Sequence, residues 1–286
     1  MAIFNNQATL TFGGKVLNSN ITEGELISRI RLTKNAVSTD YGLGDGIVYA
    51  LTLVNEDNIP KTNITLTDDL GAYTLNGSGQ LFIPLTYVDG SILYYQNGVL
   101  QPAPTVNAGD TLTISGIDIP AGGNVIILYE VRANSFAPLS ACSSIFNTVR
   151  TAGDGTCEEL EAAAQIPTRD EPILSIAKAI CPDEVVCGDP ITYTFIVQNT
   201  GNTDVVATDN LIVSDTFNPA LTNISVTLNG EELAEGTAYT YDETTGAFTT
   251  LPGAIPVPAA TFTRDAVTGV VTTTPGVAVI TVTGIV

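Results

Sequence analysis

The chain has 286 residues, of which 44% are hydrophobic and 14% charged, and 30 acidic against 10 basic residues give a formal net charge of −20. This composition is too apolar for a disordered acidic tail. The absence of histidine excludes Ser-His-Asp hydrolases and histidine-ligated zinc enzymes, and the negative charge argues against nucleic acid or an anionic membrane as partners. Threonine, valine and isoleucine contribute 40, 25 and 26 residues, so we expect an all-β protein.

The first predicted element is a strand at residues 3–12. Polar residues occupy its odd positions after Ile3, and apolar residues occupy four of its even positions: Phe4, Ala8, Leu10 and Phe12. This period of two is typical of a strand with one buried face. The segment has neither the basic start nor the apolar run of a secretion signal, so we expect synthesis in the cytoplasm without a Sec signal peptide. We expect residues 1–28 to form an N-terminal donor-strand arm, whose strand pairs with another domain, and its linker.

An internal repeat follows the arm. The residues Lys34, Asp45, Tyr49 and Asn55 recur 144 positions later as Lys178, Asp189, Tyr193 and Asn199. The next segments, 63–70 and 210–217, match after a three-residue insertion in the second copy. Short alternating segments separated by Gly, Pro, Asn and Asp predict an immunoglobulin-like β-sandwich in each copy. The expected domains are residues 29–153 and 173–286, joined by a linker at 154–172 in which residues 158–164 form a short helical turn.

The repeat resembles a known family of bacterial surface repeats. The resemblance is carried by Gly188, Asp189, Tyr193 and Asn199, followed by Val213-Ser214-Asp215. This pattern is similar to the family called domain of unknown function eleven, and the chain as a whole is similar to structural proteins of the spore appendages of clostridial spore-formers. The resemblance implies an extracellular or spore-surface protein that is exposed after lysis of the mother cell. It also implies that each copy ends with a strand of the form Asn-x-Ala-x-Val.

The first copy ends with such a strand at residues 145–150, whereas the second copy does not, because its last residue, Val286, corresponds to Ala133. The N-terminal strand has no copy of its own to complete. It can fold back on the second copy of the same chain or cap the first copy. Alternatively, it can complete the second copy of the next subunit by donor-strand complementation. We expect this last arrangement, which joins subunits head to tail in an open filament.

Strand alternation places polar side chains on the inner faces of both copies. In the first copy, Lys34, Asp68 and Asn147 each share a face with apolar neighbours. One interpretation is a buried ion pair beside an amide. The other is an autocatalytic isopeptide bond, as in Gram-positive pilins and adhesins, in which Lys34 joins Asn147 and Asp68 assists. That chemistry requires a neutral amine, a protonated carboxyl group and enforced contact between lysine and asparagine.

The second copy holds only part of this set. Lys178 and Asp215 point inward by the same alternation, but no asparagine follows them in a last strand. In the arm, Asn6 is in phase with the apolar positions, so Lys178 would join Asn6 of the neighbouring subunit with Asp215 assisting. Asn5 could replace Asn6 in this role.

The four cysteines, Cys142, Cys157, Cys181 and Cys187, allow three disulfide pairings. Cys142 with Cys157 and Cys181 with Cys187 are the local pairings, and we expect these. The spacing fits no zinc site, so we expect no metal and no cofactor.

These features predict a structural subunit rather than an enzyme with turnover. Its partners would be copies of itself in a head-to-tail homopolymer, together with other appendage or surface proteins, and neither nucleic acid nor a membrane. The alternative function is that of a surface adhesin or surface-layer domain that binds a ligand as a monomer.

Overall fold

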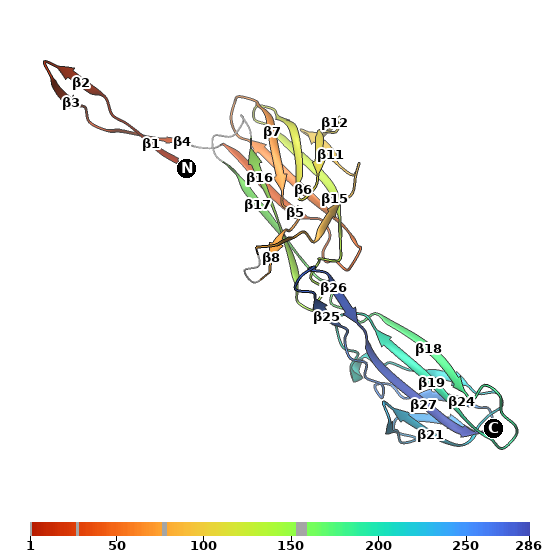
Figure 1. Cartoon of the computed structure of the whole chain (residues 1–286). Helices are drawn as coiled ribbons and strands as arrows, with labels where there is room; N and C mark the ends of the chain where they lie inside the picture. Colours follow the sequence, from red (N-terminus) through yellow and green to blue (C-terminus); the bar gives the residue numbers. More distant parts are fainter. Residues whose placement is uncertain (1, 27–28, 76–78, 153–158) are drawn as a thin grey trace. The chain divides into compact units, whose positions relative to one another are not determined.

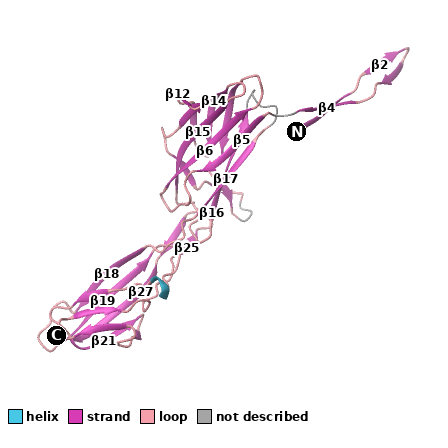
Figure 2. Ribbon diagram, turned by 180° about the vertical axis from the view of Figure 1, so that it is seen from behind, coloured by secondary structure: helices cyan, strands magenta, loops and turns pink. Residues whose placement is uncertain are grey.

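The computed structural model describes residues 2–26, 29–75, 79–152 and 159–286. In this part of the chain the one helical segment is a 3₁₀ turn, η1 (Ala207–Asp209), so the predicted all-β class is confirmed (Figures 1 and 2). Within the same ranges no helix is long and apolar enough to span a membrane. The chain divides into two compact units, Met1–Pro138 with Ser144–Pro167 and Leu139–Ser143 with Thr168–Val286. We call the first unit without its arm domain 1, and the second unit domain 2.

The N-terminal arm, residues 2–26, is a two-stranded antiparallel ribbon rather than the predicted single strand (Figure 1). β1 (Ala2–Asn6) pairs with β4 (Thr22–Leu26), and β2 (Thr9–Phe12) pairs with β3 (Lys15–Asn18). The turn is Gly13-Gly14, where both residues have positive φ, a conformation that glycine adopts without steric cost. The register shifts by one residue between the two pairs, which indicates a bulge. The arm therefore consists of two paired strands, not one.

Domain 1 is a sandwich of two antiparallel sheets. The first has the order β12-β11-β15-β6-β5, with β10 also paired to β15, and the second has the order β13-β14-β7-β16-β17. Alternate residues of β6 face the second sheet and are fully buried, among them Tyr49, Leu51 and Leu53. The bounds are β5 (Ile30–Ala36), β6 (Gly46–Asn55), β7 (Lys61–Asp68), β8 (Tyr73–Thr74), β9 (Leu81–Phe82), β10 (Leu85–Tyr87), β11 (Leu93–Gln96), β12 (Val99–Gln101), β13 (Thr105–Ala108), β14 (Leu112–Ile119), β15 (Asn124–Ala133), β16 (Ser144–Ala152) and β17 (Glu161–Pro167).

The end of domain 1 differs from the prediction. The expected linker at 154–172 contains the strand β17, which pairs with β16 from Ser144 opposite Pro167 to Arg150 opposite Glu161. The predicted helical turn is therefore wrong where the structure describes it, and domain 1 extends to residue 167. Glutamate and alanine favour a helix, but pairing with β16 and burial of Ala164 and Ile166 override that weak preference.

Domain 2 contains a five-stranded sheet of order β18-β19-β27-β21-β22 and a three-stranded sheet of order β20-β24-β23. Its core includes Phe195, Phe217 and Phe248. All of residues 168–286 are described, and among them no strand takes the place that β16 and β17 have in domain 1: β20 pairs with β24 alone. The bounds are β18 (Leu174–Cys181), β19 (Pro190–Asn199), β20 (Ser214–Thr216), β21 (Thr222–Leu228), β22 (Glu231–Glu232), β23 (Tyr239–Asp242), β24 (Ala247–Thr250), β25 (Thr261–Arg264), β26 (Val271–Thr274) and β27 (Gly276–Ile285).

The two domains repeat the same local contacts at the positions that the sequence aligns. The Asn55 side-chain amide donates hydrogen bonds to two backbone carbonyls, and the Asn199 amide does the same in domain 2. The Asp45 and Asp189 carboxylates each accept a hydrogen bond from the backbone N–H three residues earlier. Domain 2 can therefore be compared with domain 1 position by position.

Candidate functional site

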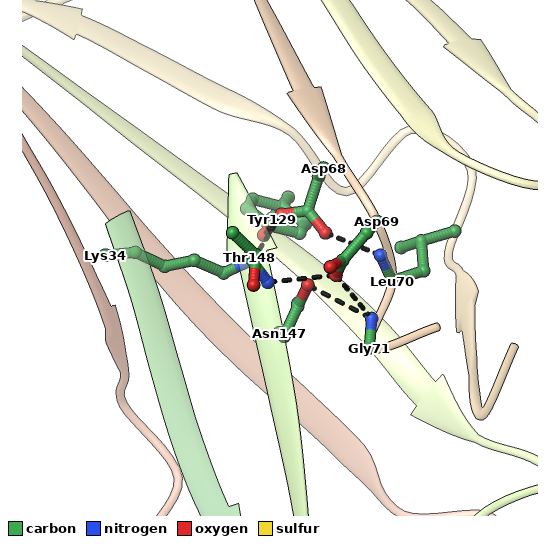
Figure 3. A network of polar contacts seen from close by, with 8 residues as sticks. All are labelled: Lys34, Asp68, Asp69, Leu70, Gly71, Tyr129, Asn147 and Thr148. Atoms are coloured by element: carbon green, nitrogen blue, oxygen red, sulfur yellow. Dashed lines mark hydrogen bonds and ion pairs between the residues drawn. The ribbon is translucent and has the colours of Figure 1, made fainter. Parts of the chain in front are cut away.

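A buried ion pair lies between the two sheets of domain 1 (Figure 3). Lys34 on β5 contacts Asp68 at the end of β7, with 2.5 Å between Nζ and Oδ2, and both side chains are fully buried. The Tyr129 hydroxyl donates a hydrogen bond to the same carboxylate oxygen, and the Leu70 backbone N–H donates to the other oxygen at 2.9 Å. Both oxygens of the buried Asp68 are therefore paired, as burial of a carboxylate requires.

Asn147 on β16 belongs to the same site. Its side chain is buried, and its Oδ1 accepts a hydrogen bond from the Gly71 backbone N–H at 3.2 Å. Its Nδ2 atom has no hydrogen-bond partner within the described part of the chain. Figure 3 shows Lys34 and Asn147 approaching the turn from Asp68 to Gly71 from two different strands. The structure thus brings together the three residues that the sequence singled out in domain 1.

Burial sets the protonation of this site. It lowers the pKa of the Lys34 amine, and the neighbouring Asp68 opposes this shift. Burial likewise raises the pKa of Tyr129 well above its ordinary range, and the charge of Asp68 raises it further. Tyr49, whose ring lies 4.8 Å from Lys34 Nζ, also has a raised pKa because of burial. Burial therefore shifts the amine toward its neutral, nucleophilic form and keeps the phenols protonated as hydrogen-bond donors.

The equivalent pair in domain 2 is open to solvent. Lys178 on β18 forms an ion pair with Asp215 on β20, but the two side chains are 42% and 21% exposed, compared with 0% for both partners in domain 1. Lys178 Nζ still lies over aromatic rings, at 4.6 Å from the centre of Tyr193 and 5.5 Å from that of Phe217. The amine is therefore directed toward the core as predicted, although the Lys178 side chain is partly exposed in the single chain. Alternation sets the direction of a side chain, and a covering strand is needed to exclude water from it.

Apolar residues beside Lys178 are exposed as well. On β18, Leu174, Ile176 and Ile180 are 40%, 58% and 44% exposed, whereas Ile30, the domain 1 equivalent of Leu174, is 5% exposed. A groove of about 170 Å³ lies between β18 and the segment that leads into β20, and it is lined by Leu174, Ser175, Ile176, Val197, Leu211, Ile212 and Val213. We call the unpaired edge of β20, this groove and the exposed face of β18 the open strand position.

The arm carries a matching set of exposed side chains. The residues of the predicted donor strand are all exposed, including Phe4 at 58%, Leu10 at 61% and Phe12 at 82%, together with Asn6 and Ala8. Across the ribbon, Phe4 lies opposite Gly24 and Asn6 opposite Thr22, whereas Ile3 and Asn5 lie opposite Glu25 and Glu23. Because opposite residues of an antiparallel pair share a face, one face of β1 and β4 carries Phe4, Asn6, Thr22 and Gly24, with no charge, and the other carries both glutamates.

The cysteines that the structure describes are free. Cys142, Cys181 and Cys187 are exposed thiols, so the predicted bond between Cys181 and Cys187 is not formed in this structure. Cys157, the expected partner of Cys142, lies outside the described residues. Within the described ranges, no group of three or more His, Cys, Asp or Glu side chains could hold a metal ion.

Sequence reasoning missed several parts of the site. Tyr129 could have been found from its alternation with the apolar residues of β15, but its contact with Asp68 follows only from the packing of the two sheets against each other. The Gly71 N–H is a backbone group and leaves no side-chain signal. The second strand of the arm does have a signal: Gly13-Gly14 between two alternating segments is typical of a two-residue hairpin turn.

No protein-family model and no curated protein matches the sequence. Among solved structures, the chain is similar to the major pilin subunit BcpA of Bacillus cereus, at 11% identity and a TM-score of 0.36, covering 96% of this chain and 73% of that one. It is also similar to ACE19, the collagen-binding subdomain of the Enterococcus faecalis surface protein ACE, at 9% identity and a TM-score of 0.31, covering 50% and 99%. A third similar structure is the collagen-binding domain of a Staphylococcus aureus adhesin, at 11% identity and a TM-score of 0.29, covering 49% and 99%. These structures are a pilin subunit and two collagen-binding domains, and the likeness concerns the fold alone.

Proposed function

We propose that the chain is a structural subunit that assembles head to tail into an extracellular fibre, in which the arm of one copy occupies the open strand position of domain 2 in the next. The observation that carries the proposal is the contrast between the two domains. Domain 1 has β16 and β17 beside β7, whereas the equivalent edge of β20 is unpaired. An unpaired edge beside exposed apolar side chains is a template for strand addition. A spore appendage or pilus-like fibre, as the sequence resemblance implies, is the setting in which we place this function.

The arm fits the open strand position in strand number and in side-chain character. In domain 1 the position is taken by a two-stranded antiparallel unit, β16 with β17, and the arm is also a two-stranded antiparallel unit. The uncharged face of β1 and β4 can be buried without placing a carboxylate in the core. Burying Phe4 and Leu10 would contribute about 1.5–3 kcal/mol each, which favours a stable joint.

The position of the arm on domain 1 favours a second copy as its partner. The chain enters domain 1 from the arm at Ile30, the start of β5. It leaves domain 1 after Pro167, whose carbonyl accepts a hydrogen bond from the backbone N–H of Tyr41, beyond the far end of β5. Entry and exit therefore lie at opposite ends of domain 1. Domain 1 also has its own β16 and β17, so it offers no equivalent position for the arm to cap.

We expect Phe4→Asp in the arm to abolish fibres, because docking would bury the new carboxylate without a partner. The matched control is Ile3→Asp, one residue away on the opposite face, which should assemble normally. Both side chains are exposed in the isolated chain, Phe4 at 58% and Ile3 at 71%, so neither change should disturb folding. Electron microscopy and analytical ultracentrifugation measure the outcome. A wild-type chain that stays monomeric would contradict the proposal and favour the adhesin alternative. Assembly by a chain that lacks residues 2–26 would also contradict the proposal.

The proposal includes an isopeptide bond within domain 1. The neutral Lys34 amine attacks Cγ of Asn147, the new bond joins Nζ to Cγ, and the Cγ–Nδ2 bond breaks. Asp68 carries one amine proton to Nδ2, which leaves as ammonia. The Gly71 N–H, 3.2 Å from Oδ1, can stabilise the charge that develops on that oxygen.

The bond between Lys34 and Asn147 can be detected as a loss of mass in the denatured chain. We expect wild type to weigh less than its sequence by one ammonia, and Asn147→Ala to have the full sequence mass. Asn5→Ala, outside domain 1, should keep the loss. A wild-type monomer with the full sequence mass would show that Lys34 and Asp68 form an ion pair only.

A further inference from the structure

We infer that the joint between subunits is itself covalent: Lys178 of one copy forms an isopeptide bond with Asn6, and not Asn5, of the arm of the next copy. This inference rests on the proposed function, because the arm must occupy the open strand position before the bond can form. Domain 2 then holds one half of a reaction site, and the arm of a second copy supplies the other half.

Domain 2 provides the acceptor half of the site. Lys178 is paired with Asp215, as Lys34 is paired with Asp68, and its amine lies over the rings of Tyr193 and Phe217. The group that domain 1 adds to this arrangement is the Asn147 amide on β16. An incoming strand at the same place would cover the amine, exclude water and supply that amide.

The residues that lie opposite Asn6 and Asn5 on β4 favour Asn6 as the residue that is bonded to Lys178. In domain 1 the inward residues of β16 include Ile145 and Asn147, and the residues opposite these two on β17, Ile166 and Ala164, are buried too. When Asn6 takes the place of Asn147, the other inward positions are taken by Phe4, Thr22 and Gly24, all uncharged. When Asn5 does so, Glu23 and Glu25 become the inward residues, which would bury two carboxylates without partners. Only the Asn6 register is compatible with a buried joint.

The ring of Phe4 also extends across the arm to the neighbouring strand. A Cβ atom added to Gly24 would lie 2.3 Å from Cζ of Phe4, so the ring of Phe4 covers Gly24. In the Asn6 register this pair replaces Ile145 and Ile166, so one large and one minimal residue replace two of middle size. In this register the ring of Phe4 lies over the inward positions of both strands of the arm.

The reaction balances without an added reagent. Lys178 Nζ attacks Cγ of Asn6, the Cγ–Nδ2 bond breaks, and Asp215 passes a proton from the amine to the leaving nitrogen. One ammonia is released for each joint, and nothing is oxidised or reduced. The strand pairing supplies the enforced contact that makes such a slow amide exchange accessible.

The test uses fibres of the full chain, boiled in detergent and separated by size. We expect a ladder of covalent multimers in wild type, and a cross-linked peptide that joins Lys178 to Asn6 and lacks one ammonia. Asn6→Ala should lose the ladder while electron microscopy still shows fibres, because the apolar docking remains. Asn5→Ala, the matched control, should keep the ladder, and Lys178→Ala should lose it.

The outcomes separate the two proposals. Wild-type fibres that dissolve into monomers, or a ladder that persists in Asn6→Ala, would overturn the covalent joint and leave the fibre proposal standing. Absence of wild-type fibres would overturn both. A ladder lost in Asn5→Ala and kept in Asn6→Ala would overturn the register argued from Glu23 and Glu25.

Discussion

In the Asn147→Ala background, where Lys34 keeps its free amine, Asp68→Asn is expected to lower the free energy of unfolding of domain 1 by about 3–5 kcal/mol, because it leaves that buried amine without its counter-charge. Both side chains of this pair are fully buried in the wild-type chain. The Tyr129 hydroxyl also loses the charged acceptor of its hydrogen bond. Hydrogen exchange measured by mass spectrometry can follow domain 1 separately from domain 2, so the loss can be assigned to the correct domain.

Two controls test whether this cost comes from the buried charge. Asp215→Asn changes the equivalent pair in domain 2, whose side chains are 42% and 21% exposed, and should cost no more than about 1 kcal/mol in the monomer. Adding Lys34→Met to Asp68→Asn should recover most of the loss, since the unpaired charge is removed. Equal costs for Asp68→Asn and Asp215→Asn would contradict this account.

The cost of Asp68→Asn should also depend on pH. Burial already lowers the pKa of Lys34 below its ordinary value of 10.5, and loss of Asp68 removes an opposing influence. The folded state then binds fewer protons than the unfolded state below that ordinary value. Stability of the variant should therefore rise as the pH rises toward 10.5, whereas the stability of the parent chain with Asp68 should change less. A variant whose stability is flat over this range would show that Lys34 keeps its charge.

The sequence predicts those features that depend on alternation within a single segment. Strand class, the tandem repeat and the inward direction of Lys34, Asp68 and Asn147 follow from residues two apart, and the structure places all three side chains in the core. Predictions of features that depend on pairing between segments are wrong, or such features leave no signal in the sequence. β17 contains the helix-favouring run from Glu161 to Ala164, and only its pairing with β16 makes it a strand.

The same distinction explains the open strand position. Alternation predicts that Lys178 and Lys34 point inward alike, but it cannot show whether a neighbouring strand covers them. Exposure of 42% for one lysine side chain against 0% for the other is a property of the sheet edge. The two domains thus act as an internal comparison, in which domain 1 has a pair of strands and one asparagine that have no equivalent among residues 168–286.

That comparison leads to the second large effect. A full chain with an additional copy of residues 2–26 attached after Val286 should fail to form fibres, although its own N-terminal arm is unchanged. The linker should match residues 134–143, which connect β15 to β16 in domain 1. The attached ribbon then reaches the open strand position of its own domain 2, as β16 and β17 reach theirs. Because an attached ribbon acts at an effective concentration of about millimolar, it should exclude the arm of a second copy at micromolar protein.

The control for this experiment is the same extended chain with Phe4→Asp and Leu10→Asp in the attached copy only. That ribbon cannot be buried without two unpaired carboxylates, so the open strand position stays accessible and fibres should form. Sedimentation should therefore give monomers for the first extended chain and polymers for its control. Hydrogen exchange should show added protection at Ser214–Thr216, the free edge of β20, in the first chain alone. Normal fibres from both chains would show that assembly uses another surface, because the acceptor would be occupied in every copy of the first.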